Sequence, residues 1–368
     1  MSTGSKLLAI LSTFLLLLTL TSSEDSDYSE EDPDWPEAWT EWDRMDEEDR
    51  VVEHNHYFGW PPKIIPETEG WRKLSERRIN QVRYIKSDAD KYDAWIQTMA
   101  SAVSQPNFTE FGWALTRAPQ NLTDTLRQAV HDGLPTARSE GYIDVINGLT
   151  PIFIDRPELM KRALDELWPI HEAWSQEKLR PYIAYGFRLY RNQSSLLMHI
   201  DKSNTHIISC IFHIDSSEDA EPWPVLIEDF AGNTNEVILK SGDMLLYESS
   251  KCFHGRPGQF NGSWYSSIFV HYYPVKEEWT SVNHDFMGHY AVPEDWNEIP
   301  DQEPTHPTLI MQGTSMQEPD CEHGWCELAY GRTIKWEGPA EEHYALTSGG
   351  KRYHLYGQDY EKEKTNEL

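Results

Sequence analysis

Basic residues are scarce in this 368-residue chain, which has 32 Lys and Arg against 61 Asp and Glu and a formal net charge of −29. A chain this acidic repels the phosphates of nucleic acids and the head groups of anionic membranes. The composition therefore excludes nucleic acid as an expected partner and favours a neutral or basic substrate.

Long apolar runs are also few. The run from Leu7 to Leu20 is nearly all apolar or hydroxylic, but it is short of the roughly 20 apolar residues that a membrane-spanning helix needs. Lys6 before the run and the small residues Thr21 and Ser23 after it predict a signal peptide over 1–23, with a signal anchor as the alternative. After cleavage we expect no membrane association and a chain in the endoplasmic reticulum lumen or outside the cell.

Cysteine is rare as well, with four residues in the whole chain. Cys321 and Cys326 lie close together in a polar turn and predict a local disulfide in an oxidising lumen. A zinc site that includes His323 is the rival interpretation. Cys210 and Cys252 lie in apolar, strand-like runs, which predicts buried free thiols.

Two further features agree with a secretory route. The chain ends in Thr-Asn-Glu-Leu, which resembles the Lys-Asp-Glu-Leu class of retrieval signals. Asn-x-Ser/Thr sequons predict a glycoprotein. They begin at Asn107, Asn121, Asn192 and Asn261.

Composition and periodicity divide the rest of the chain into four parts. Residues 24–50 are strongly acidic without a clear period, which predicts disorder. Residues 51–180 are expected to form a helical support region and residues 181–274 a strand-rich core. Residues 275–368 have weak periodicity and are expected to form an irregular extension, with a late hairpin at Gly349-Gly350.

Three helices are expected in the support region. Apolar stripes predict helices over 87–103 and 121–130. In the third, Asp155 is the expected N-cap, with Glu158 completing a capping box. Pro169 is expected to kink or end this helix, because proline removes a backbone donor from the helix interior.

Short runs of Ile, Val, Tyr and Phe between turn residues predict strands in the core. They cover 182–190, 196–200, 206–214, 225–230, 236–239, 243–247, 252–254 and 264–273. Eight short strands joined by tight turns are typical of two facing antiparallel sheets. The expected fold is therefore α+β: a double-stranded β-helix (jelly-roll) core with N-terminal helical support.

A candidate metal site lies at the end of one predicted strand. His199 and Asp201 are two residues apart, so in a strand both side chains point to the same face. His254, on a later strand, is the candidate third ligand. Two histidines and one carboxylate on one face of Fe(II) leave coordination positions open for a chelating 2-oxo acid and dioxygen, which a closed four-ligand zinc site does not.

The window Tyr182–Pro274 resembles the 2-oxoglutarate/Fe(II)-dependent dioxygenase superfamily, on its prolyl 4-hydroxylase-like side. Four features carry the resemblance. They are His199-x-Asp201, the Gly242-Asp243 turn into an apolar strand, His254-Gly255, and the closing strand Ser267–Pro274. It implies Fe(II) held by the two histidines and the aspartate, 2-oxoglutarate as cosubstrate, and ascorbate as an accessory reductant. The implied activity is hydroxylation of a residue, with proline as one candidate, in a secretory-pathway protein or peptide.

The resemblance also assigns residues to 2-oxoglutarate, with one departure. Prolyl hydroxylases place a tyrosine nine residues before the first histidine, where this chain has Tyr190. The family usually puts a basic residue nine to twelve positions after the distal histidine, and none stands between Ser263 and Ser266. A dianionic cosubstrate needs a cation. Arg256 is the first candidate and Arg188 the second.

Two alternatives stay open. The missing basic residue in the closing strand favours a non-catalytic jelly-roll module that binds a glycan, peptide or metal. A hydroxylase of the same fold that acts on a small molecule is the other. The sequence leaves the oligomeric state undetermined.

Overall fold

The computed structural model describes residues 68–95, 105–202, 205–275, 298, 303–304, 306–312, 315–326, 333–337, 340–347 and 352–355. The expected signal peptide, acidic segment and retrieval-like C-terminus lie outside these residues. The chain divides into two units, residues 1–50 and 51–368, and all described residues belong to the second. No helix among the described residues is long and apolar enough to span a membrane.

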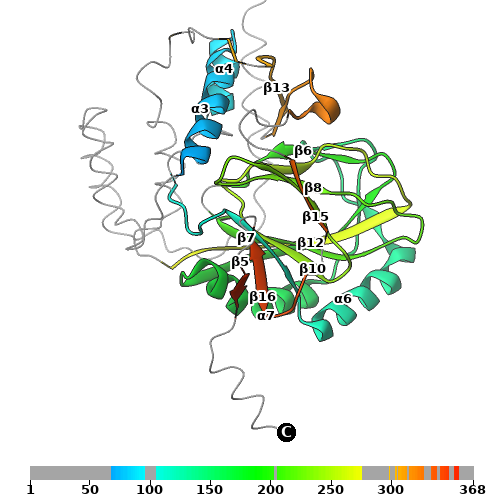
Figure 1. Cartoon of the computed structure of the whole chain (residues 1–368). Coiled ribbons are helices and arrows are strands. Elements are labelled where there is room, and N and C mark those ends of the chain that lie inside the picture. The colour runs from blue at the N-terminus through cyan, green and yellow to red at the C-terminus, as the bar shows by residue number, and fades with distance from the viewer. Residues whose placement is uncertain are drawn as a thin grey trace, which may run out of the picture. The chain divides into compact units, whose positions relative to one another are not determined.

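Two β-sheets make up most of this unit (Figure 1). The first, here called the major sheet, contains nine strands of the described chain. In order across the sheet these are β17 (Arg352–His354), β16 (Tyr344–Thr347), β1 (Trp113–Arg117), β10 (Asp243–Glu248), β7 (Ile208–Ser216), β12 (Trp264–Pro274), β5 (Leu179–Arg191), β4 (Ile152–Phe153) and β2 (Arg138–Ser139).

The second, here called the minor sheet, has eight strands within the described ranges. Their order is β13 (Ile310–Gln312), β14 (Ser315–Gln317), β6 (Ser195–His199), β11 (His254–Arg256), β8 (Val225–Glu228), β9 (Thr234–Ile238) and β15 (Thr333–Glu337), with β3 (Ile146–Asn147) paired to β6. The pairs are antiparallel except β15 with β9. The sheets pack face to face, since Ile211, Leu245 and Tyr247 of the major sheet share one buried cluster with Val225 and Ile227 of the minor sheet.

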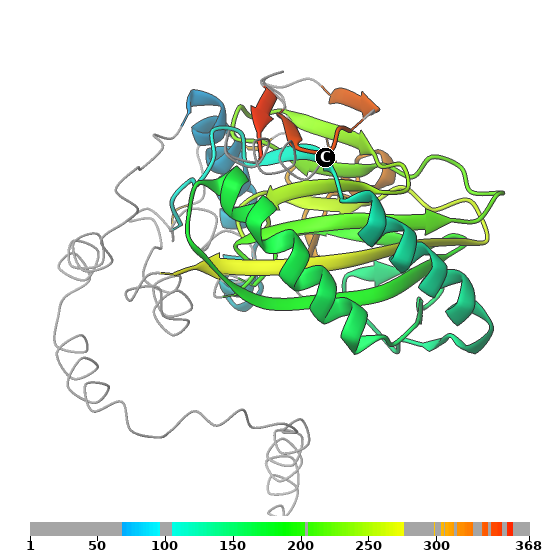
Figure 2. The same ribbon diagram turned by 90° about the horizontal axis from the view of Figure 1, so that it is seen from below.

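Helices cover the outer faces of both sheets. Figure 2 shows α6 (Gln120–Gly133) and α7 (Pro157–Ser175) lying across the major sheet. On the minor sheet, α3 (Glu69–Arg83) and α4 (Asp88–Ala94) contribute Val82 and Ala94 to a cluster with outward-facing strand residues. The strands supply Met198 and Met316 to this cluster, and Ile200 and Phe253, directly after β6 and directly before β11, also belong to it. Two short 3₁₀ turns, Leu134–Thr136 and Glu322–Gly324, complete the described elements.

Each of the eight strands expected in the core has a counterpart in the structure. The hairpin expected around Gly349-Gly350 is confirmed as the antiparallel pair β16–β17. The Cys321–Cys326 disulfide and the two buried free cysteines, Cys210 and Cys252, are also confirmed.

Three expectations need correction. Arg156 rather than Asp155 is the N-cap of α7 and makes no side-chain cap; Pro157 follows it and has no amide proton to satisfy. Pro169 does not end the helix, which continues to Ser175 because Ile170 and Trp174 bury their side chains in the core. The flanking regions are also more strand-rich than expected: 51–180 contributes β1 to β4 and 275–368 contributes β13 to β17.

Truncation of the α7 core should show how strongly helix packing supports the major sheet. Leu167 is fully buried, so Leu167→Ala should lower the free energy of unfolding by about 2–5 kcal/mol through lost apolar contact and a residual cavity. Urea denaturation measures the change. Asp165→Ala, which removes only an exposed ion pair with Lys161, is the control and should change stability by about 1 kcal/mol or less. Equal losses in both variants would contradict this account of the core.

Candidate metal centre

Strand pairing brings the three candidate ligands together. His199 ends β6, Asp201 follows two residues later, and His254 begins β11. The two strands are antiparallel neighbours in which His254 lies directly opposite His199. Their close approach depends on Gly255, because a Cβ there would lie 2.7 Å from the Leu197 carbonyl oxygen.

The ligand atoms of these residues lie within 4.8 Å of one another. His199 Nε2 is 3.7 Å from Asp201 Oδ1, and His254 Nε2 is 3.9 Å from Asp201 Oδ2. The two imidazole rings lie 4.4 Å apart between centroids. One ion can therefore contact all three side chains with small adjustments of their rotamers.

Backbone carbonyls determine the tautomer of both histidines. His199 Nδ1 is 2.7 Å from the Leu197 oxygen, and His254 Nδ1 is 2.9 Å from the Cys252 oxygen. A carbonyl only accepts, so each Nδ1 carries the proton and donates it. Each Nε2 then keeps its lone pair for a metal, the arrangement that metal-binding histidines commonly adopt.

Asp201 is ionised in this setting. Burial alone would raise its pKa, but the surrounding imidazoles, led by those of His254 and His271, hold the pKa well below its usual range. The Tyr247 hydroxyl donates to Asp201 Oδ2 at 3.3 Å, and burial raises the pKa of Tyr247, which keeps this donor protonated. The backbone N–H of Asp201 donates to the Ser249 carbonyl at 2.8 Å, which ties the ligand to the major sheet.

The donor set fits a divalent transition metal such as Fe(II). It has two neutral imidazole nitrogens and one ionised carboxylate, and no further metal-ligating group joins the cluster in the described chain. His199, Asp201 and His254 are the residues that would hold the ion.

Sequence reasoning missed two neighbours of the centre. His271 Nδ1 lies 4.0 Å from Asp201 Oδ2 and 2.8 Å from the Ser209 hydroxyl, and its ring packs 3.9 Å from that of His206. Tyr247 is the other. Both residues alternate inward on strands that were expected, so strand parity could have indicated them, but parity alone does not say which inward residues reach Asp201.

Arg256 reaches from the minor to the major sheet. Its Nη2 donates to the Tyr265 hydroxyl at 3.3 Å and its Nη1 donates to the Trp223 carbonyl. The guanidinium carbon lies 4.6 Å from the ring centroid of Tyr265 and 4.7 Å from that of Trp223. Arg256 is only 2% exposed, and within the described ranges no carboxylate pairs with it. A buried, unpaired cation is costly and favours an anionic ligand.

Tyr190 joins the same group of side chains. It lies opposite Tyr265 in the β5–β12 pair, so both side chains share a face, and its ring packs 5.0 Å from that of Trp223. Its hydroxyl is buried, and apart from an interaction with the Arg188 side chain, which can only donate, it has no hydrogen-bond partner among the described residues. It is therefore free to donate to a ligand beside Arg256.

Arg188, the second candidate for the 2-oxo acid, already has a carboxylate partner. Its Nη2 and Nε donate to Glu140 at 2.6 Å and 2.8 Å, and the Tyr185 hydroxyl donates to the same carboxylate at 2.6 Å. A cavity of about 490 Å³ adjoins this group. Its lining includes Arg138, Glu140, Phe153, Asp155, Arg156 and Tyr185.

Solved structures similar to this fold include several 2-oxoglutarate oxygenases. The prolyl 4-hydroxylase of Pseudomonas putida is 14% identical, with a TM-score of 0.35 over 48% of this chain and 98% of that one. A prolyl hydroxylase of Trichoplax adhaerens in complex with a hypoxia inducible factor peptide is 10% identical, with a TM-score of 0.34 over 53% and 97%. HygX of Streptomyces hygroscopicus, with nickel and 2-oxoglutarate bound, is 12% identical, with a TM-score of 0.33 over 45% and 83%.

No family model matches the chain, and no curated protein matches it either.

The buried histidines predict a loss of stability in acid. Burial, followed by the nearby Arg256 cation, lowers the pKa of His213 to about 3 from an ordinary 6.5. The unfolded chain therefore binds a proton that the folded chain does not, and the free energy of unfolding falls as pH drops from about 6.5 towards 3. His213→Gln should make this slope shallower by up to about 1.4 kcal/mol per pH unit, measured by urea denaturation at stepped pH. Identical slopes for both proteins would be incompatible with a neutral, buried His213.

Proposed function

We propose that this chain is an Fe(II)- and 2-oxoglutarate-dependent dioxygenase with a double-stranded β-helix core. The observation that carries the proposal is the convergence of His199, Asp201 and His254, with Nδ1 of each histidine bonded to a carbonyl. Fe(II) with a chelated 2-oxo acid supplies the activation of dioxygen and the oxidative decarboxylation that drives hydroxylation of a C–H bond.

The chain's own residues orient and protect this centre. The carbonyls of Leu197 and Cys252 keep the ring nitrogens in the binding tautomer, and Tyr247 holds Asp201 by donating a hydrogen bond. His199 and His254 are buried, which limits the access of bulk water to their ring nitrogens. Such restraint on ligand orientation is what metal centres require for selectivity.

Arg256 and Tyr190 are proposed to hold the far carboxylate of 2-oxoglutarate. Arg256 lies two residues beyond His254 on the same strand and has no carboxylate partner within the described chain. A dicarboxylate bound there would neutralise it, and the buried Tyr190 hydroxyl would add a neutral donor. Tyr265, in the window where the family usually has a basic residue, accepts a bond from Arg256, so the cation comes from a different strand.

The proposed substrate is a residue of a protein or peptide in the secretory pathway, with proline as one candidate. The Cys321–Cys326 disulfide supports a lumenal location, because disulfides persist in oxidising compartments.

A non-catalytic binding module is the second candidate function. It is favoured by Tyr265, which stands where the family usually places its basic residue and already bonds Arg256. A module of this kind would bind a ligand beside Arg256 without turning over 2-oxoglutarate.

Turnover of 2-oxoglutarate separates the two candidates. Purified full-length chain with Fe(II), 2-oxoglutarate and oxygen should release succinate, slowly without substrate and faster with an accepted peptide. Asp201→Ala is the control and should release none, because it removes the charged ligand. Equal succinate from both proteins, or none from the unaltered chain with any peptide, would refute the dioxygenase proposal.

Removal of the unpaired cation should weaken 2-oxoglutarate binding alone. Arg256→Gln loses a charge-assisted contact, so the Kd for 2-oxoglutarate should rise about 10–100-fold while the Kd for the metal stays the same. Calorimetric titration of the metal-loaded protein measures both. Arg180→Gln, an exposed arginine on β5, is the matched control. Unchanged 2-oxoglutarate affinity in Arg256→Gln would assign the carboxylate to another residue.

Removal of one hydroxyl should give a smaller effect in the same assay. Tyr190→Phe keeps the ring that packs on Trp223 but removes the free donor, so the Kd for 2-oxoglutarate should rise about 3–10-fold. Tyr182→Phe, at a half-exposed tyrosine on the same strand, should leave it unchanged. Wild-type affinity in Tyr190→Phe would mean that the tyrosine only fills space.

A further inference from the structure

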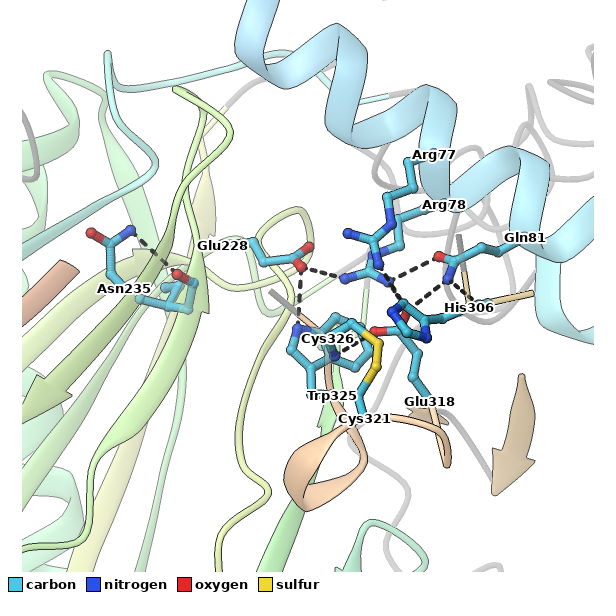
Figure 3. A network of polar contacts seen from close by, with 11 residues as sticks. Arg77, Arg78, Gln81, Glu228, Asn235, His306, Glu318, Cys321, Trp325 and Cys326 are labelled. Carbon is cyan, nitrogen blue, oxygen red and sulfur yellow. Dashed lines mark hydrogen bonds and ion pairs between the residues drawn. A yellow bond between two sulfur atoms is a disulfide. The ribbon is translucent and has the colours of Figure 1, made fainter. Parts of the chain in front are cut away.

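A buried arginine joins two carboxylates on the outer face of the minor sheet (Figure 3). Arg78 Nη2 lies 2.5 Å from Glu228 Oε1, and its Nη1 lies 3.0 Å from Glu318 Oε1. All three side chains are fully buried. A buried charge cluster of this kind persists only when every member has partners of opposite charge.

The two carboxylates belong to the strands that flank the candidate ligands. Glu228 is the last residue of β8, and its neighbour Ile227 pairs with His254 of β11. Glu318 directly follows β14, in which Ser315 pairs with His199 of β6. Across the minor sheet the order is β14, β6, β11, β8. A single guanidinium on α3 therefore ties together the outer neighbours of both ligand strands.

Further bonds fix the orientation of this cluster. Gln81, one turn along α3, accepts from Arg78 Nη1 at 2.9 Å and donates to Glu318 Oε1 at 2.6 Å. The Trp325 ring lies 3.9 Å from the Arg78 guanidinium carbon, and its Nε1 donates to Glu228 Oε1 at 3.2 Å. Both ends of the guanidinium are held, so the distance between its two carboxylates is fixed as well.

The Cys321–Cys326 disulfide closes the loop that presents Trp325 (Figure 3). The backbone N–H of Cys326 donates to Glu318 Oε2 at 2.9 Å, and that of Cys321 donates to the Glu318 carbonyl at 3.0 Å. Glu318 is thus held from α3 on one side and from the closed loop on the other.

The pairing of β6 with β11 sets His254 opposite His199 but is too short to fix their separation alone. Strand β11 has three residues, and its pairing with β6 shifts register between His254 and Arg256. Few ladder bonds therefore fix His254 relative to His199. A restraint from outside the two strands is needed to hold two imidazoles within the roughly 0.5 Å tolerance of a functional site.

We propose that Arg78 is a positioning residue for the metal centre, which sets the separation of His199 and His254 by tying β14 to β8. This inference rests on the part of the proposed function that concerns metal binding, and it holds whether or not the chain turns over 2-oxoglutarate. Without the link that Arg78 makes between β14 and β8, all three ligand side chains are still present, but β6 and β11 can move apart. Metal affinity therefore falls although the donor set is unchanged.

Cobalt titration of the full chain tests the proposal without activity as a readout. Arg78→Met should bind Co(II) at least about tenfold more weakly than the unaltered chain. It also leaves the buried Glu228 without its cation and Glu318 with Arg77 alone, 3.2 Å away. Lost stability therefore has to be separated from lost position. Leu126→Ala, fully buried on α6 over the major sheet, is the control for stability and should keep Co(II) affinity.

A triple variant keeps the test informative if Arg78→Met unfolds. Arg78→Met with Glu228→Gln and Glu318→Gln removes both carboxylate charges together with the Arg78 link, and the amide oxygen at position 318 can still accept from Arg77. The triple variant should therefore melt above the single variant yet bind Co(II) as weakly. Unaltered affinity in the triple variant, or the same affinity loss in Leu126→Ala at equal melting temperature, would overturn the positioning role. An unaltered chain that binds Co(II) but releases no succinate would refute only the dioxygenase, and one that binds no Co(II) would refute both.

Discussion

The antiparallel pairing of β6 with β11 is the constraint on which the site depends. It sets His254 opposite His199, and it is possible only because Gly255 lets the two backbones approach closely. Asp201, two residues beyond the end of β6, completes the ligand set and is held by Ser249, which directly follows β10 of the major sheet. Both sheets therefore contribute to one small volume, and the helices that cover them matter because they keep the sheets in place.

Three buried arginines of the described chain differ in whether a carboxylate pairs with them. Arg188 is paired with Glu140, and Arg78 with Glu228 and Glu318, so each of these guanidinium groups is satisfied within the fold. Arg256 is just as buried, but among the described residues its contacts are a carbonyl, a hydroxyl and two aromatic rings, with no carboxylate. In an acidic chain with an excess of carboxylates, a buried arginine without one indicates a place for an external anion.

Much of the core could be predicted because its strands alternate strongly and end at turn residues. The same alternation brought His199 and Asp201 to one face. The strands of the C-terminal part were harder to predict, since β13 to β17 are short. In addition, β14, β15 and β16 pair with β6, β9 and β1, which lie far away in sequence. Pro169 does not end α7, because tertiary burial of Ile170 and Trp174 outweighs a local helix-breaking preference.

Contacts between remote residues explain most of what sequence reasoning missed. The bond from Tyr247 to Asp201 and the tie from Arg78 to Glu318 depend on sheet order and on the packing of α3, which no local pattern contains. For the same reason, the sequence did not decide between Arg188 and Arg256 as the arginine that binds 2-oxoglutarate. Glu140, which pairs with Arg188, lies outside the predicted core. The sequence could identify both arginines as candidates, but only three-dimensional contacts reveal which of them has no carboxylate partner among the described residues.

The dependence of 2-oxoglutarate binding on the metal tests the central claim most directly. The metal-free chain should bind one Fe(II) ion per molecule without oxygen, and 2-oxoglutarate should bind tightly only after that ion is present, because the oxo acid needs the metal as well as Arg256. Equal affinity for 2-oxoglutarate with and without Fe(II), or no stoichiometric Fe(II) binding, would contradict the account.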